Sequence, residues 1–146
     1  MRCGKCGNRE LERRNMNGIL KTHWKDYPIV HLTKDLELWH CPKCGETPYE
    51  GRDPKRVDEA VEATVRDQAS QFIDIIRSKA DCSVEELATR IGVTPEYLST
   101  IRSQKRTPSF AVWNVLKAIA TDPKAMFPHF DPGIDPARAN LLLRRA

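Results

Sequence analysis

The chain has 146 residues, of which 40% are hydrophobic and 30% charged, and a formal net charge of +4. This length suits one ordinary domain or two very small ones, and the composition predicts a folded, soluble protein. A transmembrane helix is not expected, because no apolar run approaches the roughly 20 residues that one needs. The N-terminal residues lack the pattern of a signal peptide, so we expect a cytoplasmic protein.

Two cysteine pairs lie in the N-terminal third of the chain. The motif CGKCG, with Cys3 and Cys6, recurs as CPKCG, with Cys41 and Cys44. Two residues between cysteines allow both sulfur atoms to point at one ion, and the following glycine permits a positive φ. We therefore predict a structural Zn²⁺ held by all four cysteines in a closed tetrahedral site. The alternatives are two coincidental cysteine pairs or a redox dithiol, although a redox motif normally occurs once and after a strand.

Other cysteine and histidine residues are weaker ligand candidates. His40 directly precedes Cys41 and could replace a ligand, but four cysteines already complete a tetrahedral shell. We expect His23 and His31 on strand faces. Cys82 is expected to be a small buried hydrophobic residue and not a ligand.

The residues between the cysteine pairs show the alternation typical of short strands. We predict strands at 11–15, 19–24, 29–33 and 36–40. Asn17 and Gly18 are a strong two-residue hairpin signal between the first two strands. The expected small core consists of Trp24, Tyr27, Leu36, Leu38 and Trp39. A lobe of about fifty residues buries little apolar surface, so bound zinc should contribute much of its stability.

A long helical pattern follows. Asp53 as N-cap and Pro54 at the first helical position predict its start, and neither glycine nor proline occurs over 55–80. Apolar residues recur there at steps of three and four. One helix fits this pattern, and so do two helices that meet near 67–70. A single helix would be a stiff connection to the residues that follow.

Two short helices are predicted next. Ser83 and Glu86 form a capping box for a helix over 84–91, and Gly92 interrupts the pattern. The second helix begins at 94 or 95 and runs to about 103. Two short helices joined by a turn with glycine predict a helix-turn-helix, whose second helix enters the DNA major groove.

The C-terminal residues predict further helices. One begins at 107–109 and closes the core, and a short one covers 124–129. Asp135 and Pro136 have the pattern of another helix start. The leucines at 141–143 would pack on the domain or form a dimer seam.

Several residues of 84–109 follow a familiar order and spacing, namely Leu87, Ala88, Gly92, Val93, Leu98, Ser99, Ile101, Pro108 and Ser109. This order resembles the Xre/Cro family of phage-type repressors. Two Cys-x-x-Cys pairs ahead of such a domain are similar to the MqsA-type antitoxins of type II toxin–antitoxin systems. The resemblance implies a structural-zinc lobe that binds an RNA-cleaving toxin. It also implies a C-terminal domain that dimerises and represses its operon at a palindromic operator in double-stranded DNA.

The chain departs from this pattern at the positions that would read bases. Glu96 and Thr100 match positions where the antitoxin family places an amide and an arginine. Arg102 stands where the Xre/Cro pattern usually has an acid, and Gln104 where it often has the glycine that ends the helix. The resemblance therefore does not carry the family's operator sequence to this chain.

The second of the two short helices supplies the candidate DNA-binding residues. We expect these to face the groove: Thr94, Pro95, Glu96, Ser99, Thr100 and Ser103. Glu96 can accept a hydrogen bond from cytosine N4, while Ser99 and Thr100 read either base edge. The expected phosphate contacts are Arg102, Lys105 and Arg106. The alternative for these charges is a solvated helix end.

Together these patterns predict an α+β chain with a zinc-binding β lobe at 1–52, a helical connector at 53–68 and a helix-turn-helix domain with a C-terminal extension at 69–146. The expected function is a sequence-specific repressor, the antitoxin that binds its toxin and regulates its own operon. We expect a homodimer that associates through the C-terminal helix or the connector.

Two alternatives remain open from the sequence. One is a phage- or mobile-element-type regulator whose zinc lobe serves dimerisation or effector binding, with no toxin. RNA binding by the aromatic residues Trp24, Tyr27 and Trp39 is another. An enzyme is not expected, because no catalytic triad, phosphate loop or carboxylate cluster stands out and a four-sulfur site has no open position.

Overall fold

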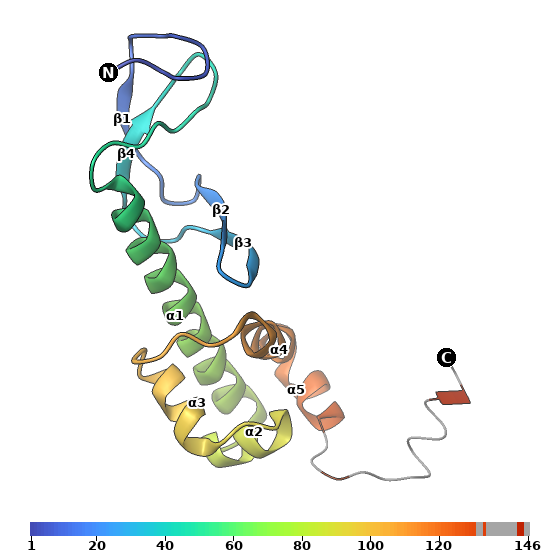
Figure 1. The fold of residues 1–146 in the computed structure, drawn as a ribbon. Coiled ribbons are helices and arrows are strands. Elements are labelled where there is room, and N and C mark those ends of the chain that lie inside the picture. Colours follow the sequence, from blue (N-terminus) through green and yellow to red (C-terminus); the bar gives the residue numbers. More distant parts are fainter. Residues whose placement is uncertain (131–132, 134–142, 145–146) are drawn as a thin grey trace. The chain divides into compact units, whose positions relative to one another are not determined.

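The computed structural model describes residues 1–130, 133 and 143–144 of the chain (Figure 1). Up to residue 130 it contains four strands in two small antiparallel sheets, followed by five α-helices and a 3-10 helix. The chain divides into two compact units, Met1–Gln68 and Ala69–Ala146. The fold class is therefore α+β.

The strands of the first unit form one interrupted hairpin (Figure 1). They are β1 (Glu12–Asn15), β2 (Lys21–Trp24), β3 (Tyr27–His31) and β4 (Glu37–His40). β1 pairs with β4 and β2 pairs with β3. Asn15 lies opposite Glu37 and Lys21 lies opposite His31, so the register is the same on both sides of the interruption.

The predicted hairpin between the first two strands is wrong. The chain reverses instead between Trp24 and Tyr27, which face each other, and Lys25 there has a φ of 50°. Asn17 and Gly18 do form a turn, but within the interruption. A turn motif shows only that the chain can bend locally, whereas strand pairing depends on which side chains are buried together.

Within the interruption, the two arms of the hairpin remain connected by backbone hydrogen bonds. The Met16 N–H donates to the Leu36 carbonyl at 2.8 Å, and the Gly18 N–H donates to the Leu32 carbonyl at 2.9 Å. Met16, Leu32 and Leu36 are all buried. Burial of these apolar residues thus decides the pairing that the local turn signal missed.

The core of the first unit combines the hairpin with the beginning of the helix α1 (Asp53–Ala80). The buried apolar residues of the hairpin are Met16, Trp24, Tyr27, Val30, Leu32, Leu36 and Leu38, and those of the helix are Val57, Val61 and Val65. Trp39, expected in this core, is half-buried, and the Arg13 guanidinium lies 4.4 Å from its ring centroid. Trp24 and Tyr27 are core residues and are not available to stack on RNA bases.

One continuous helix, α1 (Asp53–Ala80, 28 residues), follows the hairpin. This selects one helix over the two-helix alternative. Asp53 is the first residue of the helix and not its N-cap, and its carboxylate accepts from the Glu50 N–H at 3.0 Å and from Arg56 at 2.9 Å. Residues 53–68 belong to the first compact unit and the rest of α1 to the second.

The second unit adds shorter helices around its own core. They are α2 (Val84–Ile91), α3 (Pro95–Arg102), α4 (Phe110–Thr121), α5 (Pro123–Met126) and the 3-10 helix η1 (Phe127–His129). The buried core comprises Ala69, Ile73, Ile76, Cys82, Val84, Leu87, Ala88, Leu98, Ile101, Leu116 and Ile119. Cys82 is a buried residue of this core, as predicted.

The predicted starts of α2, α3 and α4 are confirmed, whereas the short helix predicted at 124–129 is divided into α5 and η1. Ser83 and Glu86 form a reciprocal capping box at α2, which ends at Gly92 with a φ of 79°. The Thr94 and Ser109 side chains cap α3 and α4. A capping side chain satisfies an N–H group that has no partner in the first turn, which explains why these polar residues locate helix starts so well.

Some expectations concern the C-terminal residues. The helix start predicted at Asp135 and Pro136, and Leu141 and Leu142 of the expected dimer seam, lie outside the described residues. Leu143 is 73% exposed. Among the residues that are described, no helix combines the length and the apolar character that crossing a membrane requires.

Candidate metal centre and candidate nucleic-acid interface

The four cysteines of the two repeated motifs meet at the base of the hairpin. Their sulfur atoms all lie within 4.8 Å of one another. The Sγ atoms of Cys3 and Cys44 are 3.5 Å apart, those of Cys6 and Cys41 are 3.6 Å apart, and all four thiols are free of disulfides. Four sulfurs at about 2.3 Å from a tetrahedral ion would be separated by about 3.8 Å, so this cluster fits a metal ion.

Both cysteine motifs adopt the same backbone turn. The Cys3 N–H donates to the Asn8 carbonyl and the Gly7 N–H to the Cys3 carbonyl, at 2.8 and 2.9 Å. The Cys41 N–H donates to the Glu46 carbonyl and the Gly45 N–H to the Cys41 carbonyl, again at 2.8 and 2.9 Å. Gly7 and Gly45 have φ values of 73° and 77°, which explains why glycine follows each second cysteine.

Pairing of β1 with β4 brings the two turns together. Glu12 lies opposite His40, so the chain before β1 and the chain after β4 leave the sheet at the same end. Cys3 and Cys41 are almost completely buried there, while Cys6 and Cys44 are half-buried. The hairpin register therefore places the cluster, although the motifs are far apart in the sequence.

The surroundings shift the pKa values of these thiols in opposite directions. Burial opposes ionisation of Cys41, but backbone N–H groups, first that of Cys44, and the Asn8 amide lower its pKa to about 6. The pKa of Cys3 is also lowered, chiefly by the N–H of Cys6. A backbone N–H lowers the pKa of Cys44, but burial and the three neighbouring thiols raise it to about 12.

Four cysteine sulfurs this close together form a site that could hold a cation. Close thiolates repel one another, so the last proton leaves only at high pH. A bound divalent ion removes that repulsion, and the ligands are then all thiolates. The four sulfurs can thus hold a metal ion. His40 lies beside them, but its Nε2 atom is 3.4 Å from Nη1 of Arg14, and its ring is not part of the cluster.

The predicted DNA-binding residues lie in α3, at its two ends and in the loop after it. Leu98 and Ile101 are buried in the core of the second unit. The exposed predicted residues are Thr94, Glu96, Ser99, Arg102, Ser103, Lys105 and Arg106, whereas Pro95 and Thr100 are half-buried. Seven of the nine predicted residues are therefore accessible to solvent.

Several hydroxyl groups of these residues are engaged within α3. Thr94 Oγ1 accepts from the Tyr97 N–H at 3.2 Å, and Thr100 Oγ1 donates to the Tyr97 carbonyl at 2.7 Å. Ser103 Oγ donates to the Thr100 carbonyl at 3.2 Å. Glu96 and Ser99 make no side-chain hydrogen bond or ion pair within residues 1–130. Their polar groups are consequently the most available for a ligand.

The three basic residues of the set differ in their surroundings. Arg102 Nε donates to Asp74 Oδ1 at 2.9 Å. The Arg106 guanidinium lies 5.4 Å from the centroid of the Tyr97 ring. In the described part of the chain Lys105 has no ion-pair partner. Lys105 and Arg106 thus present positive charge to solvent, whereas Arg102 is paired.

Three polar residues with specific contacts were not singled out from the sequence. Asn8 donates to the Cys41 sulfur, and both Ser70 and Asp74 of α1 bind Arg102. An asparagine directly after a Cys-x-x-Cys-Gly turn is a signal that could have been used. A serine and an aspartate four residues apart on a helix share one face, but they do not reveal their partner.

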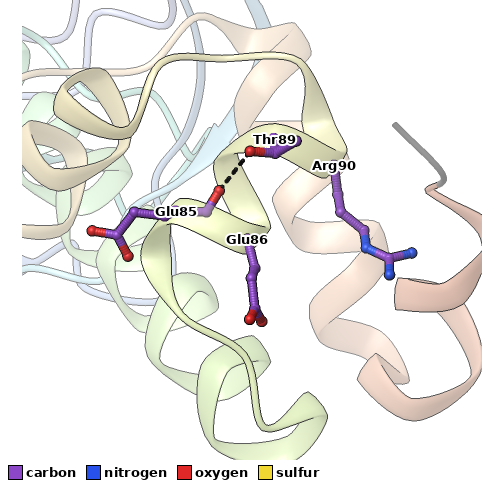
Figure 2. Close-up of a pocket in the computed structure, with 4 residues that line it drawn as sticks. All are labelled: Glu85, Glu86, Thr89 and Arg90. Atoms are coloured by element: carbon purple, nitrogen blue, oxygen red, sulfur yellow. Dashed lines mark hydrogen bonds between the residues drawn. The ribbon is translucent and has the colours of Figure 1, made fainter. Parts of the chain in front are cut away.

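A shallow depression on α2 has no comparable features. It is lined by Glu85, Glu86, Thr89 and Arg90 (Figure 2). Thr89 Oγ1 donates to the Glu85 carbonyl at 2.9 Å, and Arg90 Nη1 donates to the Phe130 carbonyl at 3.2 Å. Its polar groups are thus partly used within the chain.

Comparisons with protein-family models, curated proteins and solved structures found no match to this chain.

Proposed function

We propose that this protein is a sequence-specific DNA-binding repressor in which α2 and α3 form a helix-turn-helix. The observation that carries the proposal is the pair of eight-residue helices joined across Gly92, with a polar, exposed side on α3. The core residues Leu87, Ala88, Leu98 and Ile101 are buried at the positions where Xre/Cro repressors have apolar residues. In this proposal α3 is the recognition helix.

The roles of the exposed residues follow from their chemistry. Glu96 and Ser99 would meet base edges, because a carboxylate accepts from cytosine N4 and a hydroxyl bonds either edge. Lys105 and Arg106 would contact phosphates, which set affinity and position without reading sequence. The resemblance to dimeric repressors predicts two half-sites about one helical turn apart in a palindrome.

DNA binding can be tested with the full-length chain and a random duplex library. We expect selection of a palindromic sequence over random DNA. Arg106→Ala should weaken binding to both DNAs alike and lower the salt slope by about one charge. Glu96→Ala should lower affinity for the selected duplex by about 1–3 kcal/mol and leave random DNA almost unaffected. Equal loss on both DNAs would remove Glu96 as a reading residue, and no selection at all would contradict the proposed function.

The ion in the cysteine cluster is proposed to be Zn²⁺ in a structural role. Four thiolates in a tetrahedral arrangement suit zinc or an iron–sulfur centre, and two Cys-x-x-Cys turns are typical of structural zinc. Native mass spectrometry with elemental analysis should find one zinc per chain. Iron with inorganic sulfide would contradict this assignment.

The antitoxin role rests on the resemblance to MqsA-type proteins. It predicts that the first unit binds an RNA-cleaving toxin encoded beside this gene. Co-expression should give a stable complex and restore growth. If no neighbouring gene product binds or is neutralised while operator binding persists, the stand-alone regulator with a zinc lobe for dimerisation or effectors is the better description.

A further inference from the structure

Two residues of α1 hold the C-terminal end of α3 through a single arginine. Ser70 Oγ donates to the Arg102 carbonyl at 2.6 Å, and Asp74 Oδ1 accepts from Arg102 Nε at 2.9 Å. Arg102 is the last residue of α3. Both its main chain and its side chain are thus attached to the same helix.

We propose that Arg102 is a positioning residue that fixes the recognition helix on α1 through Ser70 and Asp74, and that it is not a phosphate contact. This inference rests on the proposed DNA-binding function for its consequence. It differs from the role expected for Arg102 from the sequence, where its charge alone suggested a phosphate anchor.

The hydrogen bond from Ser70 gives the contact its precision. Carbonyl groups in the last turn of a helix have no partner within that helix. Ser70 is only 8% exposed, so its hydroxyl must find a partner inside the protein. By donating to the Arg102 carbonyl, it satisfies both groups and defines where α3 ends relative to α1.

The ion pair with Asp74 adds a second point of attachment. Ser70 and Asp74 are four residues apart and therefore lie on one face of α1. One point of attachment would still allow α3 to rotate, whereas two points on one face restrain both its position and its rotation. The side chains of Arg102 and Asp74 are 43% and 55% exposed, so the pair alone is weak and Ser70 is the essential partner.

The consequence for DNA binding separates a positioning residue from a phosphate anchor. A lysine or arginine that neutralises a phosphate releases counterions, so its loss lowers the salt slope by about 0.9. In this proposal the Arg102 guanidinium is directed at Asp74 and contacts no phosphate, so its removal should leave that slope unchanged. A loosened α3 should instead reduce the preference for one sequence, because base contacts depend on helix position.

The test uses the full-length chain, one duplex selected from a random library and one random-sequence duplex of equal length. Dissociation constants for both are measured over a series of KCl concentrations. Ser70→Ala is compared with Ser78→Ala, which truncates an exposed serine of α1. Arg102→Gln is compared with Lys105→Gln. Asp74→Asn is compared with Glu85→Gln, which removes an equal charge from the α2 surface (Figure 2).

We expect Ser70→Ala and Arg102→Gln to reduce the preference for the selected duplex by about fivefold to tenfold, with an unchanged salt slope. Lys105→Gln should weaken both duplexes equally and lower the slope by about 0.9. A lower slope with unchanged preference for Arg102→Gln would overturn the inference. So would tighter binding of both duplexes and a steeper slope for Asp74→Asn, since Arg102 would then be an anchor restrained by Asp74.

A second measurement does not depend on DNA. Ser70→Ala should accelerate amide hydrogen exchange in the last turn of α3 more than in α4, and Ser78→Ala should not. Absence of sequence-selective binding by the wild-type chain would reject the proposed function, and exchange would then decide the positioning role alone. Unchanged exchange in α3 of Ser70→Ala would overturn that role.

Discussion

At the scale of single residues, Asn8 shows how a neighbour of the cysteine cluster tunes its sulfur atoms. Asn8 Nδ2 donates to Cys41 Sγ at 3.7 Å and to the Glu10 carbonyl at 2.9 Å. The equivalent position of the second turn is Glu46, whose carboxylate cannot donate. The two turns share a backbone but not their side-chain support, and the hydrogen bond from Asn8 helps to lower the pKa of Cys41.

Asn8→Ala should lower the affinity for Zn²⁺ by about tenfold or more, because residues that support a metal ligand typically matter to this extent. Competition with a chromogenic chelator measures the change. Asn17→Ala is the control, since Asn17 binds Asp35 and not a cysteine. Equal affinities for wild type and Asn8→Ala would show that the Asn8–Cys41 contact does not support the ion.

Affinity for Zn²⁺ should fall as the pH falls. In the metal-free chain the pKa of Cys41 is about 6 and that of Cys44 is about 12. At neutral pH the ion must therefore displace the Cys44 proton, and below about pH 6 it must displace the Cys41 proton as well. The pH dependence should become steeper below that point, as measured by chelator competition from about pH 8 to about pH 5. An affinity independent of pH would contradict the thiolate assignment.

At the scale of secondary-structure elements, the start of α1 is part of the first unit and not only a connector. Trp24 Nε1 donates to Asp58 Oδ1 at 2.6 Å, and Lys34 Nζ lies 3.0 Å from Asp67 Oδ2. Between these contacts Thr64 accepts from the Thr33 N–H at 3.2 Å. Polar contacts between the hairpin and this half of α1 thus add to the packing of its buried valines.

Thr64→Val should destabilise the first unit by about 1–2 kcal/mol. Thr64 is fully buried, and valine has the same shape but leaves the Thr33 N–H without its partner. Urea unfolding followed by Trp fluorescence measures the change. Thr64→Ser keeps the hydroxyl, so it should cost less than Thr64→Val. The opposite order would show that the methyl group matters more than the hydrogen bond.

A residue with an unfavourable backbone conformation directly follows α1. Asp81 follows the helix with a φ of 50° and places a negative charge at a helix C-terminus. Asp81→Gly should therefore stabilise the second unit by about 1 kcal/mol in urea unfolding. Lys79→Gly, inside the last turn, should destabilise by about the same amount. A loss of stability in Asp81→Gly would mean that the Asp81 side chain has a stabilising contact.

At the scale of the whole molecule, the two compact units have separate sources of stability. The cysteine cluster lies in the first unit, while the second has a continuous apolar core of its own. The candidate metal ligands of this small unit come from both ends of a hairpin. A bound ion would connect these two ends, and its removal would break the connection. Within the described residues, the cysteine cluster is the one group of candidate metal ligands, and it lies outside the second unit.

Cys41→Ser or a chelator should therefore unfold the first unit and leave α2 to α4 folded. Amide NMR signals from the two units measure this directly, and trypsin should cut at Arg66 faster after chelation. Cys82→Ser is the control, because Cys82 is buried outside the cluster. Identical thermal melts with and without chelator would contradict a structural role for the ion.

Much of this protein follows from local sequence patterns. The cysteine motifs predicted the cluster, and Ser83, Thr94 and Ser109 marked the starts of α2, α3 and α4, because caps and metal turns depend on residues close in the chain. The apolar period of 55–80 was equally readable. These features are local, and the rest of the fold hardly changes them.

Only the tertiary structure decided which strands pair and which polar groups meet. Asn17 and Gly18 form a turn, but burial of Met16, Leu32 and Leu36 places the hairpin reversal at Lys25 and Asp26. The charge of Arg102 was readable, whereas its attachment to Ser70 and Asp74 depends on how α1 and α3 pack. Such contacts join residues about thirty positions apart, and packing brings them together without a local signature.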